Sequence, residues 1–126
     1  MQLPEDDARY LTDKGLNWHL EPDGAGAFLV LHNYPLDATR YDREATDIML
    51  RIPPGYPLAA LDMFYADPWV RLNSGAYPPQ ADVPCDACGR RWQRFSRHLT
   101  QPWRAGVDGL PGFLALVAGE LQRVPR

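Results

Sequence analysis

Lysine is almost absent from this sequence. Lys14 is the only one, although 13 of the 126 residues are basic, so arginine supplies nearly all of the positive charge. Sixteen acidic residues outnumber the basic ones and give a formal net charge of −3. A chain with this balance has no overall attraction to nucleic acid. It contains no nucleic-acid-binding motif either, and we expect no nucleic-acid partner.

Cysteine and long apolar stretches are also scarce. The chain has two cysteines, Cys85 and Cys88, and three of its first seven residues are acidic, which is not typical of a signal peptide. No apolar run approaches the roughly 20 residues that span a membrane. These features predict a cytoplasmic protein with reduced thiols and no membrane partner.

Internal repeats and low-complexity tracts are missing too, and the length is that of one domain, residues 1–126. Thirteen prolines predict short elements and long, stiffened loops. Pro4 and three acids suit the first turn of a helix over residues 5–13, ended by Gly15. Alternating or apolar runs predict four strands in an antiparallel meander, at residues 16–20, 27–32, 45–52 and 61–66.

The second half loses this regular pattern. Residues 69–101 are predicted to be irregular, and the Gly- and Pro-containing stretch 73–89 reads as a surface loop, which in a compact domain is often functional. Asp108 is positioned to cap a closing helix, with Pro111 in its first turn. Its apolar face should pack on the sheet: Leu110, Phe113, Leu114, Val117, Leu121 and Val124. The predicted fold class is α+β.

Several short motifs occur in a characteristic order: Gly55-Tyr-Pro57, Leu61-Asp-Met-Phe64, Trp92-Gln-Arg-Phe-Ser-Arg-His98 and Trp103-Arg-Ala-Gly-Val-Asp-Gly-Leu110. With these motifs the chain resembles the ubiquitin-conjugating (UBC-like) fold. More narrowly, it is similar to the prokaryotic type-E ubiquitin-conjugating-enzyme-like proteins, over roughly residues 10–122. The resemblance implies a four-stranded meander, an active-site segment over residues 69–104 and a closing helix.

The resemblance also implies a function. Eukaryotic members carry a catalytic cysteine shortly before the tryptophan that corresponds to Trp103, and here Phe95-Ser96 occupies that position. The family's His-Pro-Asn triplet is missing. The implied activity is that of a carrier that accepts a ubiquitin-like modifier from an activating enzyme, on Ser96 as an oxyester. The implied setting is a bacterial conjugation system linked to phage defence or stress, with an isopeptidase encoded nearby and no cofactor.

Serine is a poor nucleophile at neutral pH and needs a base within hydrogen-bond reach. In extended chain, residues two apart point the same way, so His98 is the expected base for Ser96. Arg94, Arg97 and Arg104 lie in a stretch without acids and are candidates to stabilise an oxyanion or to dock an acidic partner. The simpler interpretation makes Ser96 and His98 loop-stabilising residues and the arginines a solvated face.

Two alternatives stay open. UBC-like domains without a catalytic cysteine can bind modifiers without transferring them. Alternatively, Cys88 or Cys85 folds back to serve as a thioester nucleophile. The Cys-x-x-Cys spacing also suits zinc, but a zinc site needs about four ligands and only His98 is an evident third, so we predict no metal.

Overall fold

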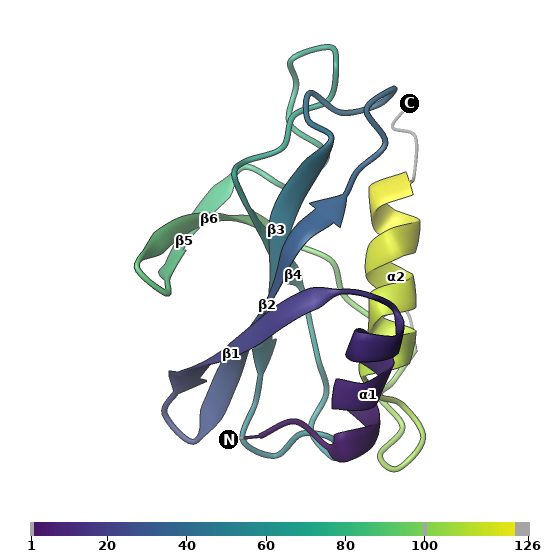
Figure 1. Ribbon diagram of the computed structural model, residues 1–126. Coiled ribbons are helices and arrows are strands. Elements are labelled where there is room, and N and C mark those ends of the chain that lie inside the picture. Colours follow the sequence, from purple (N-terminus) through teal and green to yellow (C-terminus); the bar gives the residue numbers. More distant parts are fainter. Residues whose placement is uncertain (1, 100, 123–126) are drawn as a thin grey trace.

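The computed structural model describes residues 2–99 and 101–122 and places two helices against an antiparallel sheet (Figure 1). The helices are α1 (Glu5–Asp13) and α2 (Leu110–Gln122). The strands are β1 (Asn17–Asp23), β2 (Gly26–Pro35), β3 (Ala45–Ile52), β4 (Phe64–Asp67), β5 (Val83–Ala87) and β6 (Arg90–Phe95). Their order in the sheet is β1-β2-β3-β4-β6-β5, which confirms the α+β class.

The first half follows the sequence-based expectation closely. α1 and β3 have the predicted bounds, β2 is longer than predicted at both ends, and β1 begins one residue later than predicted and ends three residues later. The fourth strand is the exception, because it begins at Phe64 and not at residue 61. Met63 has φ 57°, in the left-handed region, and extended backbone cannot run through such a residue. Leu61 and Asp62 therefore lie in a loop ahead of β4.

The prediction of four strands is wrong in number, because six strands form. The additional pair, β5 and β6, lies within the stretch expected to be irregular. Both residues of its two-residue turn have positive φ, 54° at Cys88 and 67° at Gly89, which is the backbone of a tight hairpin turn. The turn was not predicted because it carries a cysteine at a position where Asn or Asp is usual. The strand β5 was not predicted because it contains Pro84. Pro84 is tolerated because β5 is an edge strand.

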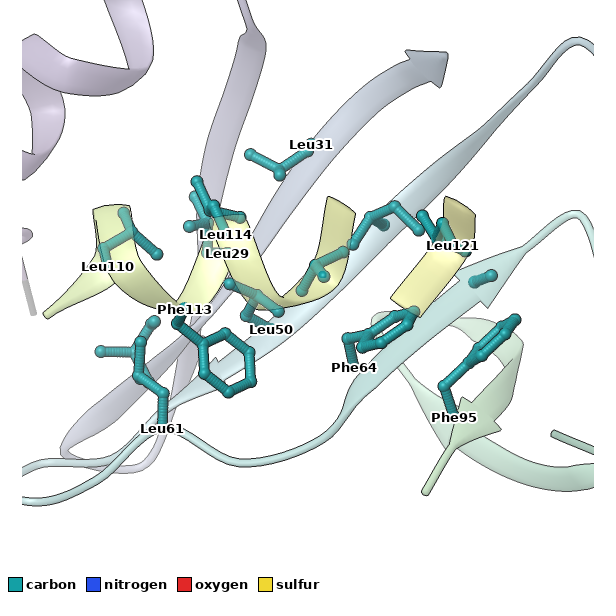
Figure 2. Close-up of a cluster of buried hydrophobic side chains, with 14 of the residues drawn as sticks. Leu29, Leu31, Leu50, Leu61, Phe64, Phe95, Leu110, Phe113, Leu114 and Leu121 are labelled. Atoms are coloured by element: carbon teal, nitrogen blue, oxygen red, sulfur yellow. The ribbon is translucent and has the colours of Figure 1, made fainter. Parts of the chain in front are cut away.

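The two faces of the sheet are both covered, but by different elements. Leu29, Leu31 and Leu50 point to one face, where side chains of α2 pack over them (Figure 2). Val30 and Met49 alternate with these residues and so point to the opposite face. There they form a second cluster with Tyr65 and Trp92, against which the β5–β6 hairpin packs. Figure 1 shows the hairpin on one side of the sheet and α2 on the other.

The start of α2 is stabilised differently from the prediction. Tyr56 Oη accepts a hydrogen bond from the backbone N–H of Leu110 at 2.8 Å and donates one to the buried Asp7 carboxylate at 2.5 Å. The Tyr-Pro turn thus joins α1 to α2. Asp108 was expected to cap the helix, but its carboxylate accepts bonds from the backbone N–H and the guanidinium of Arg104. The predicted apolar face is buried from Leu110 to Leu121, and Val124 lies outside the described residues.

The long loop between β4 and β5 is tied to the sheet by one side chain. Gln93 is fully buried and accepts a hydrogen bond from the Val70 N–H at 2.7 Å. Its amide nitrogen donates to the carbonyls of Val70 and Ala81, both at 2.8 Å. These bonds therefore hold the loop in place beside the end of β6, the strand that Ser96 directly follows.

Candidate active site

Ser96 stands at the point where β6 ends. The N–H of Arg97 donates to the Phe95 carbonyl at 2.9 Å, so the chain turns sharply with Ser96 at the centre. The N–H of Ser96 donates to the Gln80 carbonyl in the adjoining loop at 3.1 Å. The side chain is half-buried and lines a hollow of about 210 Å³ between this loop and α2. Its Oγ lies 3.7 Å from the Met63 Sδ, a weak partner that leaves the hydroxyl available for other bonds.

His98 belongs to a neighbouring, more open hollow of about 480 Å³. Its Nδ1 is 3.1 and 3.2 Å from the two carboxylate oxygens of Asp62. Both side chains are exposed, at 67% for His98 and 47% for Asp62. A carboxylate on one ring nitrogen fixes the orientation of an imidazole and leaves the other nitrogen, here Nε2, able to take up a proton.

Met63 connects these two sites. Its N–H donates to the Arg97 carbonyl at 3.0 Å, and this bond brings Asp62 alongside His98. Its thioether contacts Ser96. The left-handed backbone at Met63 makes both contacts possible, because it turns the chain just before β4 begins. Met63 therefore links the segment that carries Ser96 and His98 to the segment that carries Asp62, the partner of His98.

The structure corrects the expected route from Ser96 to His98. Within residues 2–99 and 101–122, no hydrogen bond joins the two side chains. The i, i+2 argument assumed extended backbone, and the sharp turn at Ser96 removes that alternation. The residue that the sequence analysis missed is Asp62. Its one sequence signal is a carboxylate between two large apolar residues, where a strand was expected.

The arginines do not form one cluster. Four of the five between residues 90 and 104 are paired with carboxylates: Arg90 with Asp47 and Asp67, Arg91 with Asp86, Arg97 with Glu120, and Arg104 with Asp108. The Arg97 pair is 2.9 Å long and mostly buried, at 15% and 18% exposed, and it ties the Ser96 turn to α2. The guanidinium of Arg97 is thus engaged in this ion pair.

Arg94 lies on the other face of the sheet. It alternates with the buried Phe95 and shares the face of Trp92. Its Nε is buried and has no hydrogen-bond partner among the described residues. The hollow beside Ser96 adjoins α2 on the other face, so this guanidinium does not face it.

The two cysteines also lie on the face opposite α2. Cys85 and Cys88 are half-buried free thiols that pack against the second cluster. Burial and the neighbouring Glu21 carboxylate raise the pKa of the Cys88 thiol to about 11. Such a thiol is protonated at neutral pH and is a weak nucleophile. In the described part of the chain, no three His, Cys, Asp or Glu side chains are arranged to hold a metal ion.

The two helices, the meander with its Tyr-Pro turn, and the site segment ahead of the last helix define a ubiquitin-conjugating-enzyme-like domain. The chain belongs to the prokaryotic E2 family E, whose family model matches residues 3–124. No curated protein and no solved structure matches it. Membership makes this protein an E2-like carrier in ubiquitin-like conjugation, with a modifier and an activating enzyme as its general partners. Among the described helices, none is long and apolar enough to span a membrane.

Proposed function

We propose that this protein carries the modifier as an oxyester on Ser96, with His98 as the general base and Asp62 as the residue that orients His98. Ser96 contacts Met63, and Asp62, the residue before Met63, holds His98; this arrangement supports the assignment. Ser96 has an otherwise unengaged hydroxyl beside a hollow, and the imidazole nearby is already held by a carboxylate. This division of roles is the one that a nucleophile, its base and an orienting group require.

The first step forms the ester. Ser96 Oγ attacks the activated C-terminal carbonyl of the modifier, a carbon–oxygen bond forms, and the bond to the leaving group on the activating enzyme breaks. The hydroxyl proton passes to His98 Nε2 and then to the leaving group. The Asp62 carboxylate stabilises the imidazolium in between. In the second step an acceptor attacks the ester carbonyl, and Ser96 regains its proton.

Ser96 Oγ contacts the Met63 thioether and makes no hydrogen bond to His98 among the described residues. A methionine side chain is flexible and adapts to irregular space, so the Met63 thioether is free to move away from Ser96 when the modifier binds. Proton transfer can also pass through one water molecule, and catalytic hydrogen bonds are often long before substrate binds. The 3.7 Å contact between Ser96 and Met63 is therefore the one we expect to break when the modifier arrives.

The wider setting is part of the same proposal. The partners are a ubiquitin-like modifier and an activating enzyme, with an isopeptidase that reverses the conjugation and a role in defence against phage. Cys85 and Cys88 are less suitable nucleophiles, because both lie on the other face of the sheet and Cys88 is protonated at neutral pH.

Intact mass spectrometry tests the assignment. The protein is incubated with the modifier and activating enzyme encoded beside it and ATP, with and without a thiol reductant. We expect an adduct that resists the reductant, disappears in Ser96→Ala and becomes reductant-sensitive in Ser96→Cys. Ser74→Ala is the matched control, since Ser74 is the only other serine and lies exposed in the β4–β5 loop.

Two other outcomes would contradict an oxyester on Ser96. A reductant-sensitive adduct on the wild-type chain that survives Ser96→Ala moves the site to a cysteine. Complex formation on a sizing column without any adduct makes the protein a binding module for the modifier.

A further inference from the structure

Met63 combines access to solvent with a contact to the candidate nucleophile. The chain has three methionines, of which Met49 is fully buried in the sheet and Met1 lies outside the described residues. Met63 is partly exposed. Its chain neighbour Asp62 lines one surface hollow, and its contact Ser96 lines another. A small oxidant in the solvent can therefore approach the Met63 side chain, whereas Met49 is shielded.

The thioether of Met63 is the one group that the Ser96 hydroxyl touches. Ser96 Oγ donates to Met63 Sδ at 3.7 Å and makes no other hydrogen bond among the residues that the structure describes. A thioether sulfur is a weak acceptor, so this bond holds the hydroxyl only loosely. The Met63 backbone is fixed separately, because its N–H donates to the Arg97 carbonyl at 3.0 Å. The sulfur is thus kept beside Ser96 whatever the strength of the contact.

Oxidation of the sulfur would change the character of this contact. When hydrogen peroxide reacts with a thioether, the sulfur donates an electron pair, a sulfur–oxygen bond forms and the bond between the two peroxide oxygens breaks. The second oxygen leaves as water with both protons. The product is a sulfoxide, a polar group in place of an apolar one. Its oxygen carries negative charge and accepts hydrogen bonds strongly, and the flexible side chain lets this oxygen turn toward Ser96.

We propose that Met63 is a peroxide-sensitive modification site and that its sulfoxide switches the carrier off by binding the Ser96 hydroxyl. The inference rests on the proposed function of Ser96. A sulfoxide oxygen accepts the hydroxyl hydrogen in a bond but is too weak a base to remove it, so the proton does not reach His98. A thiol-dependent methionine sulfoxide reductase removes the oxygen as water, returns the thioether and restores the carrier.

The oxidation leaves the rest of the molecule in place. Asp62 holds His98 through its carboxylate, and the bond from Met63 to Arg97 is made by the backbone, so neither involves the sulfur. Met63 belongs to neither of the buried clusters formed by the described residues, whereas Met49 lies in the second. A polar group on Met63 therefore does not enter the core, and we expect the urea midpoint of unfolding to stay unchanged.

Peptide mass spectrometry after peroxide treatment tests whether Met63 is the site. The full chain is treated with hydrogen peroxide, quenched with catalase and incubated with dithiothreitol. This reductant reverses sulfenic acids and disulfides of Cys85 and Cys88 but leaves methionine sulfoxide. We expect Met63 to gain an oxygen about ten times faster than the buried Met49. Equal rates at the two methionines would overturn the proposal.

Adduct formation by the treated chain tests the switch. The chain is mixed with the modifier, the activating enzyme and ATP only after the peroxide has been removed. We expect the oxidised wild-type chain to form the Ser96 adduct about tenfold more slowly than the untreated one, the effect of one strong hydrogen bond. Methionine sulfoxide reductase should restore the rate. Measured against its own untreated rate, Met63→Leu should lose the sensitivity to peroxide and Met49→Leu should keep it.

Failure of the switch and failure of the proposed function give different results. An adduct that forms equally fast before and after oxidation of Met63 would overturn the switch and leave Ser96 as the acceptor. So would a loss of rate that the reductase does not reverse, that persists in Met63→Leu, or that accompanies a lower urea midpoint. No adduct on the untreated chain would overturn the proposed function and the switch together.

Discussion

The Asp62 carboxylate holds His98 by Nδ1, at 3.1 and 3.2 Å, although 36 positions separate the two residues in the chain. The contact exists because Met63 adopts a left-handed backbone and bonds to Arg97. It gives the candidate base a fixed orientation before any partner arrives, which His98 on an exposed loop would otherwise lack.

Replacing Asp62 by Asn should slow adduct formation on Ser96 by about 100-fold, because the imidazole loses both its orientation and the charge that stabilises it when protonated. Single-turnover mass spectrometry at several pH values measures the rate. Asp86→Asn is the control, since Asp86 forms a comparable exposed pair with Arg91 on the hairpin. An unchanged rate and pH profile in Asp62→Asn would remove Asp62 from the mechanism.

A lysine placed beside His98 should capture the modifier. Gln101 is exposed and lines the hollow that holds His98, and the natural chain has a single lysine, Lys14 on the far end of α1. Gln101→Lys should therefore produce an amide adduct that survives hydroxylamine, because a tethered amine has a high effective concentration. Arg91→Lys puts the same amine on the hairpin and should not. Equal modification of Gln101→Lys and Arg91→Lys would mean that any exposed lysine reacts with the modifier and that the hollow beside His98 does not position it.

Cys88 should react slowly with iodoacetamide. Its pKa of about 11, against an ordinary value of 9.0, lowers the thiolate fraction at pH 8 by about 100-fold. Cys88→Ser and Cys85→Ser separate the two thiols in a labelling time course. Because Glu21 contributes to the shift after burial, Glu21→Gln should speed the labelling of Cys88. Rapid labelling of Cys88 in the wild-type chain would reopen the cysteine alternative.

Gln93→Leu should lower the free energy of unfolding by about 3 kcal/mol. The substitution conserves size but leaves the buried N–H and carbonyl of Val70 and the carbonyl of Ala81 without partners. Urea unfolding measures the loss. Gln122→Leu, at the exposed end of α2, should stay within about 0.5 kcal/mol of the wild type. A similarly small effect for Gln93→Leu would mean that other contacts hold the β4–β5 loop.

Local signals were sufficient for several elements. α1 was predictable from Pro4, the acids that follow and Gly15, since all of them act within one or two helical turns. β3 was predictable because its apolar run is closed by Pro53. The buried stripe of α2 was predictable from spacing alone. The motifs from Gly55 to Leu110 were likewise enough to indicate the family.

The arrangement of the candidate site depended on contacts between distant segments. The turn at Ser96 is held by Gln80, and the position of His98 by Asp62, so neither follows from the sequence between residues 92 and 111. The arginines of that stretch looked like a cluster along the chain, but strand alternation and separate carboxylate partners distribute them over two faces.

The sequence by itself determined the fold class, the family and the position of Ser96, because these are carried by periodicity and by motifs a few residues long. The tertiary structure decided the number of strands, the partner of His98 and the place of both cysteines. Each of these depends on positive φ at Met63, Cys88 or Gly89 and on pairings between residues far apart in the chain. Such pairings form only when the whole sheet is assembled, so no local window of the sequence contains them.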